Sequence, residues 1–147
     1  MKKIAAALGL ALCAAAPLRA MAAGTVPLEV DTADGRKLGF VVEVAATAEE
    51  QQTGLMWRRS VPADGGMLFV FHGERKIGMW MKNTLVPLDM LFVAADGTIR
   101  SVAHGVPQSL EDIASPGPVL AVVELAGGTA ERLGIRPGDK VASSGLR

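Results

Sequence analysis

Residues 90–104 read Met-Leu-Phe-Val-Ala-Ala-Asp-Gly-Thr-Ile-Arg-Ser-Val-Ala-His. Two apolar runs flank the dipeptide Asp96-Gly97, in which glycine accepts the positive φ of a tight turn, so the stretch has the pattern of a β-hairpin. Similar short runs, separated by Gly, Pro and Asp, occupy residues 26–30, 38–44, 67–71, 77–82, 119–125 and 140–142. Short strands at this spacing predict one mainly β domain, either a small sandwich of the jelly-roll kind or a barrel.

Two segments predict short helices. Thr47-Ala48-Glu49-Glu50 has the form of a capping box and should begin a helix of about two turns that ends near Gly54. Thr129 can cap a single helical turn over residues 129–133, with Gly134 as its left-handed end. No glycine fingerprint or phosphate loop follows a strand, so nucleotide chemistry is not supported.

The first 22 residues have the features of a secretory signal peptide. A basic start, Met1-Lys2-Lys3, precedes an apolar run over residues 4–16, and Ala20-Met21-Ala22 offers small residues where a signal peptidase reads. The run is shorter than the ~20 residues that span a bilayer. We therefore expect cleavage after Ala22, a periplasmic or secreted protein without a membrane span, and a single domain over residues 23–147 with its core at 28–141.

Cleavage changes the charge and the thiol content. The full chain has 15 basic and 15 acidic residues, and losing Lys2, Lys3 and Arg19 leaves 12 against 15, a net charge of −3. Cys13 is lost as well, which excludes disulfides and thiol chemistry. With 50% hydrophobic residues the chain is too apolar to be disordered, and it lacks the positive charge of a general nucleic-acid binder.

The segment Met79-Trp80-Met81-Lys82-Asn83-Thr84-Leu85-Val86-Pro87-Leu88-Asp89 concentrates the unusual side chains. Pro87 interrupts strand pairing, so Lys82 and Asp89 lie at opposite ends of one tight connection. A charge among apolar neighbours is costly unless it is paired. The two charges are therefore either part of the floor of a polar cleft or an ion pair that clamps the turn.

Glu124 is a second acid among apolar residues, since it shares a strand face with Leu120 and Val122. It needs a partner, and Lys82, Arg58 and Arg59 are the candidates for a bridge. An alternative makes Asp89 and Glu124 the paired carboxylates of a hydrolase, one protonated by burial and acting as acid, the other ionised and acting as base.

A further alternative is a periplasmic Cu(I)-binding protein. Met79 and Met81 would supply thioethers, Trp80 an indole face, and His72 or His104 an imidazole. Methionines at alternate strand positions also fill cores, and the two histidines have no ligand spacing. We therefore keep copper as an alternative and assign no metal and no cofactor.

The chain carries four groups of residues that point to one family: Gly54-Leu55-Met56; Gly66 to Phe71; Trp80-Met81-Lys82-Asn83-Thr84 with Pro87-Leu88-Asp89; and Glu124-Leu125 with Gly134 and Gly138-Asp139. Over about residues 28–141 it resembles the domain-of-unknown-function 192 family. The resemblance implies a small, mainly β domain that is often exported, and it implies no activity. Two departures are Met79, where an aromatic residue is commoner, and the loop at 105–118, which lacks the cysteines of some members.

Together these observations predict a binding or accessory module more than an enzyme. Its ligand would be an unknown small molecule or a component of the cell envelope. The candidate cleft combines a stacking surface, positive donors, an amide and two acids. These residues are Arg58, Trp80, Lys82, Asn83, Asp89 and Glu124.

Overall fold

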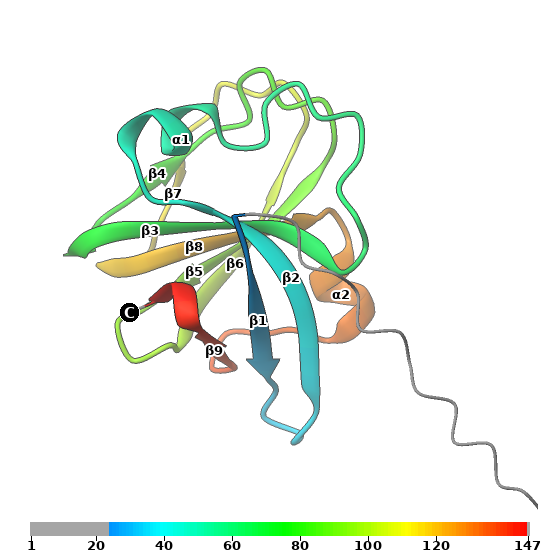
Figure 1. The fold of residues 1–147 in the computed structure, drawn as a ribbon, viewed down its shortest axis with the longest axis vertical. Helices are drawn as coiled ribbons and strands as arrows, with labels where there is room; N and C mark the ends of the chain where they lie inside the picture. Colours follow the sequence, from blue (N-terminus) through cyan, green and yellow to red (C-terminus); the bar gives the residue numbers. More distant parts are fainter. Residues whose placement is uncertain (1–23, 147) are drawn as a thin grey trace, which may run out of the picture.

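The structure is a computed structural model that describes residues 24–146 (Figure 1). Seven strands form one sheet in the order β6-β5-β8-β3-β2-β1-β9, and a second sheet pairs β4 with β7. The elements are β1 Thr25–Asp31, β2 Lys37–Ala45, α1 Ala48–Thr53, β3 Gly65–Arg75, β4 Gly78–Met79, β5 Leu88–Val93, β6 Ile99–Gly105, β7 Ile113–Ala114, β8 Val119–Ala126, α2 Thr129–Leu133, β9 Lys140–Ser143 and the 3-10 helix η1 Ser144–Leu146.

The large sheet curls, but it does not close. β2 and β3 run parallel, whereas the other neighbouring strands of this sheet are antiparallel. Its two edges approach each other at one isolated bridge, between Thr98 and Lys140. The prediction of a single small, mainly β domain is confirmed, and the described strands do not make a closed barrel. Across residues 24–146, helices are too short and too polar to cross a membrane.

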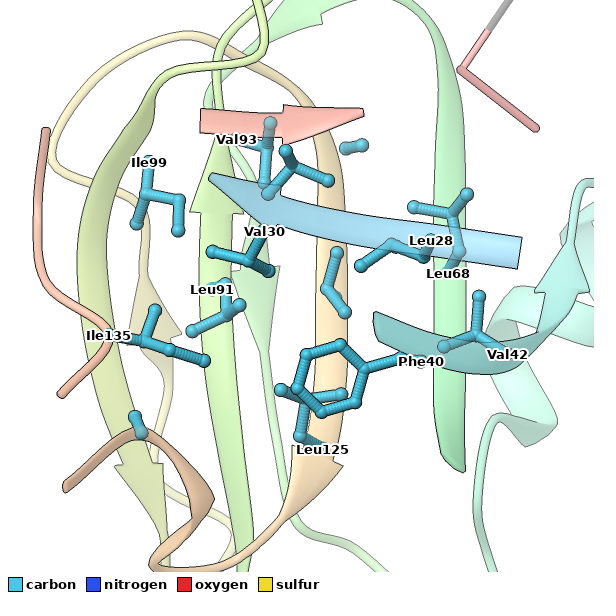
Figure 2. Close-up of a cluster of buried hydrophobic side chains, with 14 residues drawn as sticks. Leu28, Val30, Phe40, Val42, Leu68, Leu91, Val93, Ile99, Leu125 and Ile135 are labelled. Carbon is cyan, nitrogen blue, oxygen red and sulfur yellow. The ribbon is translucent and has the colours of Figure 1, made fainter. Parts of the chain in front are cut away.

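The sheet has a separate hydrophobic core on each face. Along β5, Leu91 and Val93 belong to one core while Met90 and Phe92 belong to the other, because successive side chains point to opposite faces. Figure 2 shows the first core, in which β1 and β2 fold over the centre of the sheet. Burial on both faces explains why β3, β5 and β8 read as continuous apolar runs.

A cap covers the second face. α1, β4, β7 and their connecting loops lie together at the top of Figure 1, across the sheet from β1, β9 and α2. The Gln51 side chain fixes α1 to the sheet by donating to the carbonyl of Val70 at 2.7 Å. The cap also has its own backbone bonds, from the Trp57 amide to the Asn83 carbonyl at 2.9 Å and from the Gln108 amide to the Thr84 carbonyl at 3.0 Å.

Most predicted elements are present, and two differ. The predicted hairpin at Asp96-Gly97 and the capping box at α1 are confirmed, with Thr47 and Glu50 bonded reciprocally. Residues 77–82 form only the two-residue strand β4, because they pair with β7 in the cap and then turn at Asn83, whose φ is 56°. Thr129 does not cap α2: the N-cap is Gly128, which has no side chain to bond.

The packing of β3 against β8 depends on Gly66. A Cβ atom at this position would lie 2.1 Å from the Glu124 carbonyl oxygen, a backbone atom that cannot move aside. We therefore expect Gly66→Ala to destabilise the protein by about 2 kcal/mol or more. Gly39→Ala is the matched control, since a Cβ atom there meets nothing within 4 Å. Urea unfolding of both variants checks this, and equal losses would contradict it.

Candidate functional site

One row of side chains crosses the second face of the sheet. The strand register places Glu43 beside Met67, Met67 beside Glu124, and Glu124 beside Met90. Directly opposed residues on neighbouring strands have their side chains in contact range. The Glu124 carboxyl therefore projects between two thioethers, neither of which can donate a hydrogen bond to it.

Glu124 is buried without a partner. It is 4% exposed, and within residues 24–146 its side chain makes no hydrogen bond or ion pair. Among these residues no fully enclosed side-chain oxygen lacks a partner, so the carboxyl oxygens of Glu124 retain a small accessible surface. Burial alone raises the pKa of its carboxyl to about 8. The group is therefore largely protonated at neutral pH, and removing its proton places an uncompensated charge in an apolar site.

The carboxyl opens into a small recess beneath the cap. Its walls come from the end of α1 and the residues that follow it, from Phe69 on β3, and from the segment 79–84. The volume is about 20 Å³. That is room for about one water molecule or one ion.

Aromatic and strained residues surround this recess. Trp80 is 44% exposed, and the ammonium nitrogen of Lys82 lies 5.1 Å from its ring centroid. Outside glycine, the described chain has left-handed φ values at Trp57, Asn83 and Gln108, and all three lie in the loops of the cap. Such conformations cost free energy and cluster at functional sites. The cap thus holds both the open cavity and the backbone strain.

The structure brings together three of the six predicted site residues. Trp80, Lys82 and Glu124 line the recess. Asn83 lies at its edge, with its amide nitrogen 3.8 Å from the Met56 sulfur. Arg58 is elsewhere, because it binds both carboxylate oxygens of Glu43 at 2.7 and 2.8 Å. The bridge predicted from Glu124 to a lysine or arginine is therefore wrong for the described residues.

Asp89 serves a different part of the fold. It is fully buried and accepts hydrogen bonds from His104 Nδ1 at 2.7 Å, the Gly128 amide at 3.1 Å and the Ala130 amide at 2.7 Å. Asp89 thereby supplies the N-terminal hydrogen bonds of helix α2 that its N-cap residue, Gly128, cannot supply. The predicted clamp between Lys82 and Asp89 is wrong, because His104 and two backbone amides satisfy this acid instead.

The paired-carboxylate hypothesis is also wrong. Asp89 pairs with Leu125 across the strands, whereas Glu124 pairs with Met90. Adjacent positions of a strand point to opposite faces, so the two carboxyls lie on opposite sides of the sheet. They cannot act on one bond.

The copper ligands proposed from sequence are not gathered either. Met81 is fully buried in the second core, His104 is bonded to Asp89, and His72 is exposed on β3. No group of three His, Cys, Asp or Glu side chains suited to a metal occurs in residues 24–146. Met79 does line the recess, together with Met56, which sequence reasoning missed although it stands in the Gly54-Leu55-Met56 motif.

The fold and site define a small, mainly β domain in which a capped recess opens onto one unpartnered buried acid. The chain belongs to the DUF192 family, described as "Uncharacterized ACR", whose model matches residues 29–143. This confirms the resemblance read from the sequence motifs.

Two solved structures are similar to the chain. One is a proposed transcription regulator from Sinorhizobium meliloti 1021, with 46% identity and a TM-score of 0.80 over 82% of this chain and 95% of that chain. Another is a protein of unknown function from Novosphingobium aromaticivorans DSM 12444, with 38% identity and a TM-score of 0.78 over 93% of this chain and 99% of that one. Among curated proteins, none matches.

Proposed function

We propose that this protein is an exported binding domain that takes a small ligand in the recess over Glu124. The observation that carries the proposal is the difference between its two buried acids in the sheet centre. Asp89 has three hydrogen-bond donors, as a structural acid requires, whereas Glu124 has none among the described residues. A buried polar group left without a partner is costly, and a ligand that pairs with it would remove that cost.

Binding is favoured over catalysis because the recess holds a single acid and no nucleophile paired with a base. At the rim, the Trp80 ring would add an aromatic face, over which the Lys82 ammonium lies at 5.1 Å. The description of the Sinorhizobium relative as a transcription regulator would suggest a nucleic-acid ligand for this chain as well. A net charge of −3 over residues 23–147 disfavours binding to nucleic-acid phosphates. Export is supported by the signal-peptide pattern of residues 1–22, which lies outside the described residues.

The test uses protein taken from the periplasmic fraction of a bacterial host, where a mature chain beginning at Ala23 is expected. Its methionine methyl groups are labelled with ¹³C and titrated with acetate, methylammonium, acetamide and Ag(I), the smallest representatives of four ligand chemistries. At least one probe should shift the Met56 and Met79 signals saturably. Shifts from none of the four, or shifts of equal size in Glu124→Leu, would contradict the proposal.

A further inference from the structure

The size of the recess restricts what it can hold. A volume of about 20 Å³ accepts one water-sized particle, whereas sites for organic ligands usually span several hundred Å³. Gln51 ties α1 to the sheet, and the two backbone bonds described above tie the cap loops to each other, so the walls are held in place. A single ion fits this space without rearrangement of the cap.

The charge of the site calls for a monovalent cation. Glu124 is the one acid that lines the recess, and it has no counter-ion within residues 24–146. Its neighbours on β3 and β5 are the neutral side chains Met67 and Met90. One cationic charge would neutralise the carboxylate, whereas a divalent ion would leave a buried excess charge.

The donor atoms select a soft metal. Met56 and Met79 line the recess with Glu124, and the Met56 sulfur also accepts a hydrogen bond from the Asn83 side-chain amide at 3.8 Å. Calcium and magnesium require six or more oxygen ligands, and zinc requires about four histidine, cysteine or carboxylate ligands, of which this recess offers the Glu124 carboxyl alone. Among the biological metals, thioether sulfur binds Cu(I) in preference to the others.

A cation-π contact between Lys82 and Trp80 lies at the rim of the recess. The Lys82 ammonium lies over the Trp80 ring at 5.1 Å, so this indole face accommodates positive charge next to the recess. Lys82 is exposed and makes no ion pair with Glu124. Its charge would repel a metal ion, and its exposure allows the side chain to swing into water when the ion enters.

We propose that the recess binds one soft monovalent metal ion, Cu(I) or its analogue Ag(I), through the Glu124 carboxylate and the Met56 and Met79 thioethers. This rests on the proposed function above and names its ligand. The donor set differs from the one predicted from sequence, because Glu124 and Met56 replace Met81 and the histidines. Binding exchanges charge for charge: Cu⁺ enters as the carboxyl proton leaves to solvent, and no oxidation occurs.

Anaerobic titration of the mature protein with Cu(I), in competition with the chelator bicinchoninate, tests the proposal. We expect one ion per chain, and an affinity at least tenfold weaker in Glu124→Gln, Met56→Leu and Met79→Leu. Met81→Leu is the matched control and should bind as the wild type does. Lys82→Gln should bind more tightly, because it removes a like charge.

Absence of stoichiometric binding, equal affinity in Glu124→Gln, or weaker binding in Lys82→Gln would overturn the metal assignment. Circular dichroism of each variant establishes that it is folded. If acetate or methylammonium shifts the Met56 and Met79 methyl signals while Cu(I) fails to bind, the recess is a ligand site and only the identity of the ligand is wrong. If no probe binds, both proposals fail.

Discussion

At pH 9 the Glu124→Gln variant is expected to be more stable than the wild-type protein by up to about 5 kcal/mol, and to lose this advantage as the pH falls to 4. In the unfolded chain a glutamate ionises near its ordinary pKa of 4.5, while burial keeps the folded group protonated up to about 8. Between these values the native state binds one more proton than the unfolded state. Wild-type stability therefore falls by about 1.4 kcal/mol per pH unit through this group.

The measurement is the difference in unfolding free energy between wild type and Glu124→Gln, from urea titrations at intervals between pH 4 and pH 9. Taking the difference cancels the other titrating groups, such as Asp96, whose pKa is lowered by hydrogen bonds from Thr98 and Lys140. Glu111→Gln is the control, because Glu111 is exposed in the loop before β7. Its difference from wild type should stay within about 0.5 kcal/mol. Parallel curves for wild type and Glu124→Gln would show that Glu124 does not titrate as a buried acid.

The parts of the fold that sequence predicts well are those with local causes. The turn at Asp96-Gly97 and the capping box at Thr47 each depend on residues within a few positions of one another. The cap over the second face has no such local cause. Residues 77–82 alternate as a strand should, and only the pairing of residues 78–79 with residues 113–114 shows that this stretch leaves the main sheet.

The candidate site required the register between strands that are distant in sequence. Alternation along β8 correctly places Glu124 with Val122, because one strand suffices for that inference. Whether Asp89 lies on the same face of the sheet as Glu124 depends on how β5 pairs with β8. A shift of one residue in this register would place the Asp89 side chain on the other face. The same long-range pairing brings Met67 and Met90 to Glu124.

Asp89→Ala should be the most damaging single substitution of a polar residue in the sheet, with a loss of about 3 kcal/mol or more in unfolding free energy. The carboxylate holds β5, β6 and α2 together through His104, Gly128 and Ala130. Its removal leaves the buried Ala130 amide without an acceptor at the first turn of a five-residue helix. A helix this short has little stability of its own, so its packing against the first core should weaken as well.

Two further variants separate the contributions of the three donors. His104→Ala removes an exposed imidazole and one bond, and should cost about 1 kcal/mol. Asp89→Asn keeps the shape but presents an NH₂ group to one of the donors, so its cost should lie between the other two. Hydrogen exchange at Gly128 and Ala130 should accelerate in Asp89→Asn and remain slow in His104→Ala. If His104→Ala costs as much as Asp89→Ala, Asp89 stabilises the protein through its bond to the imidazole and not through its bonds to the N-terminal amides of α2.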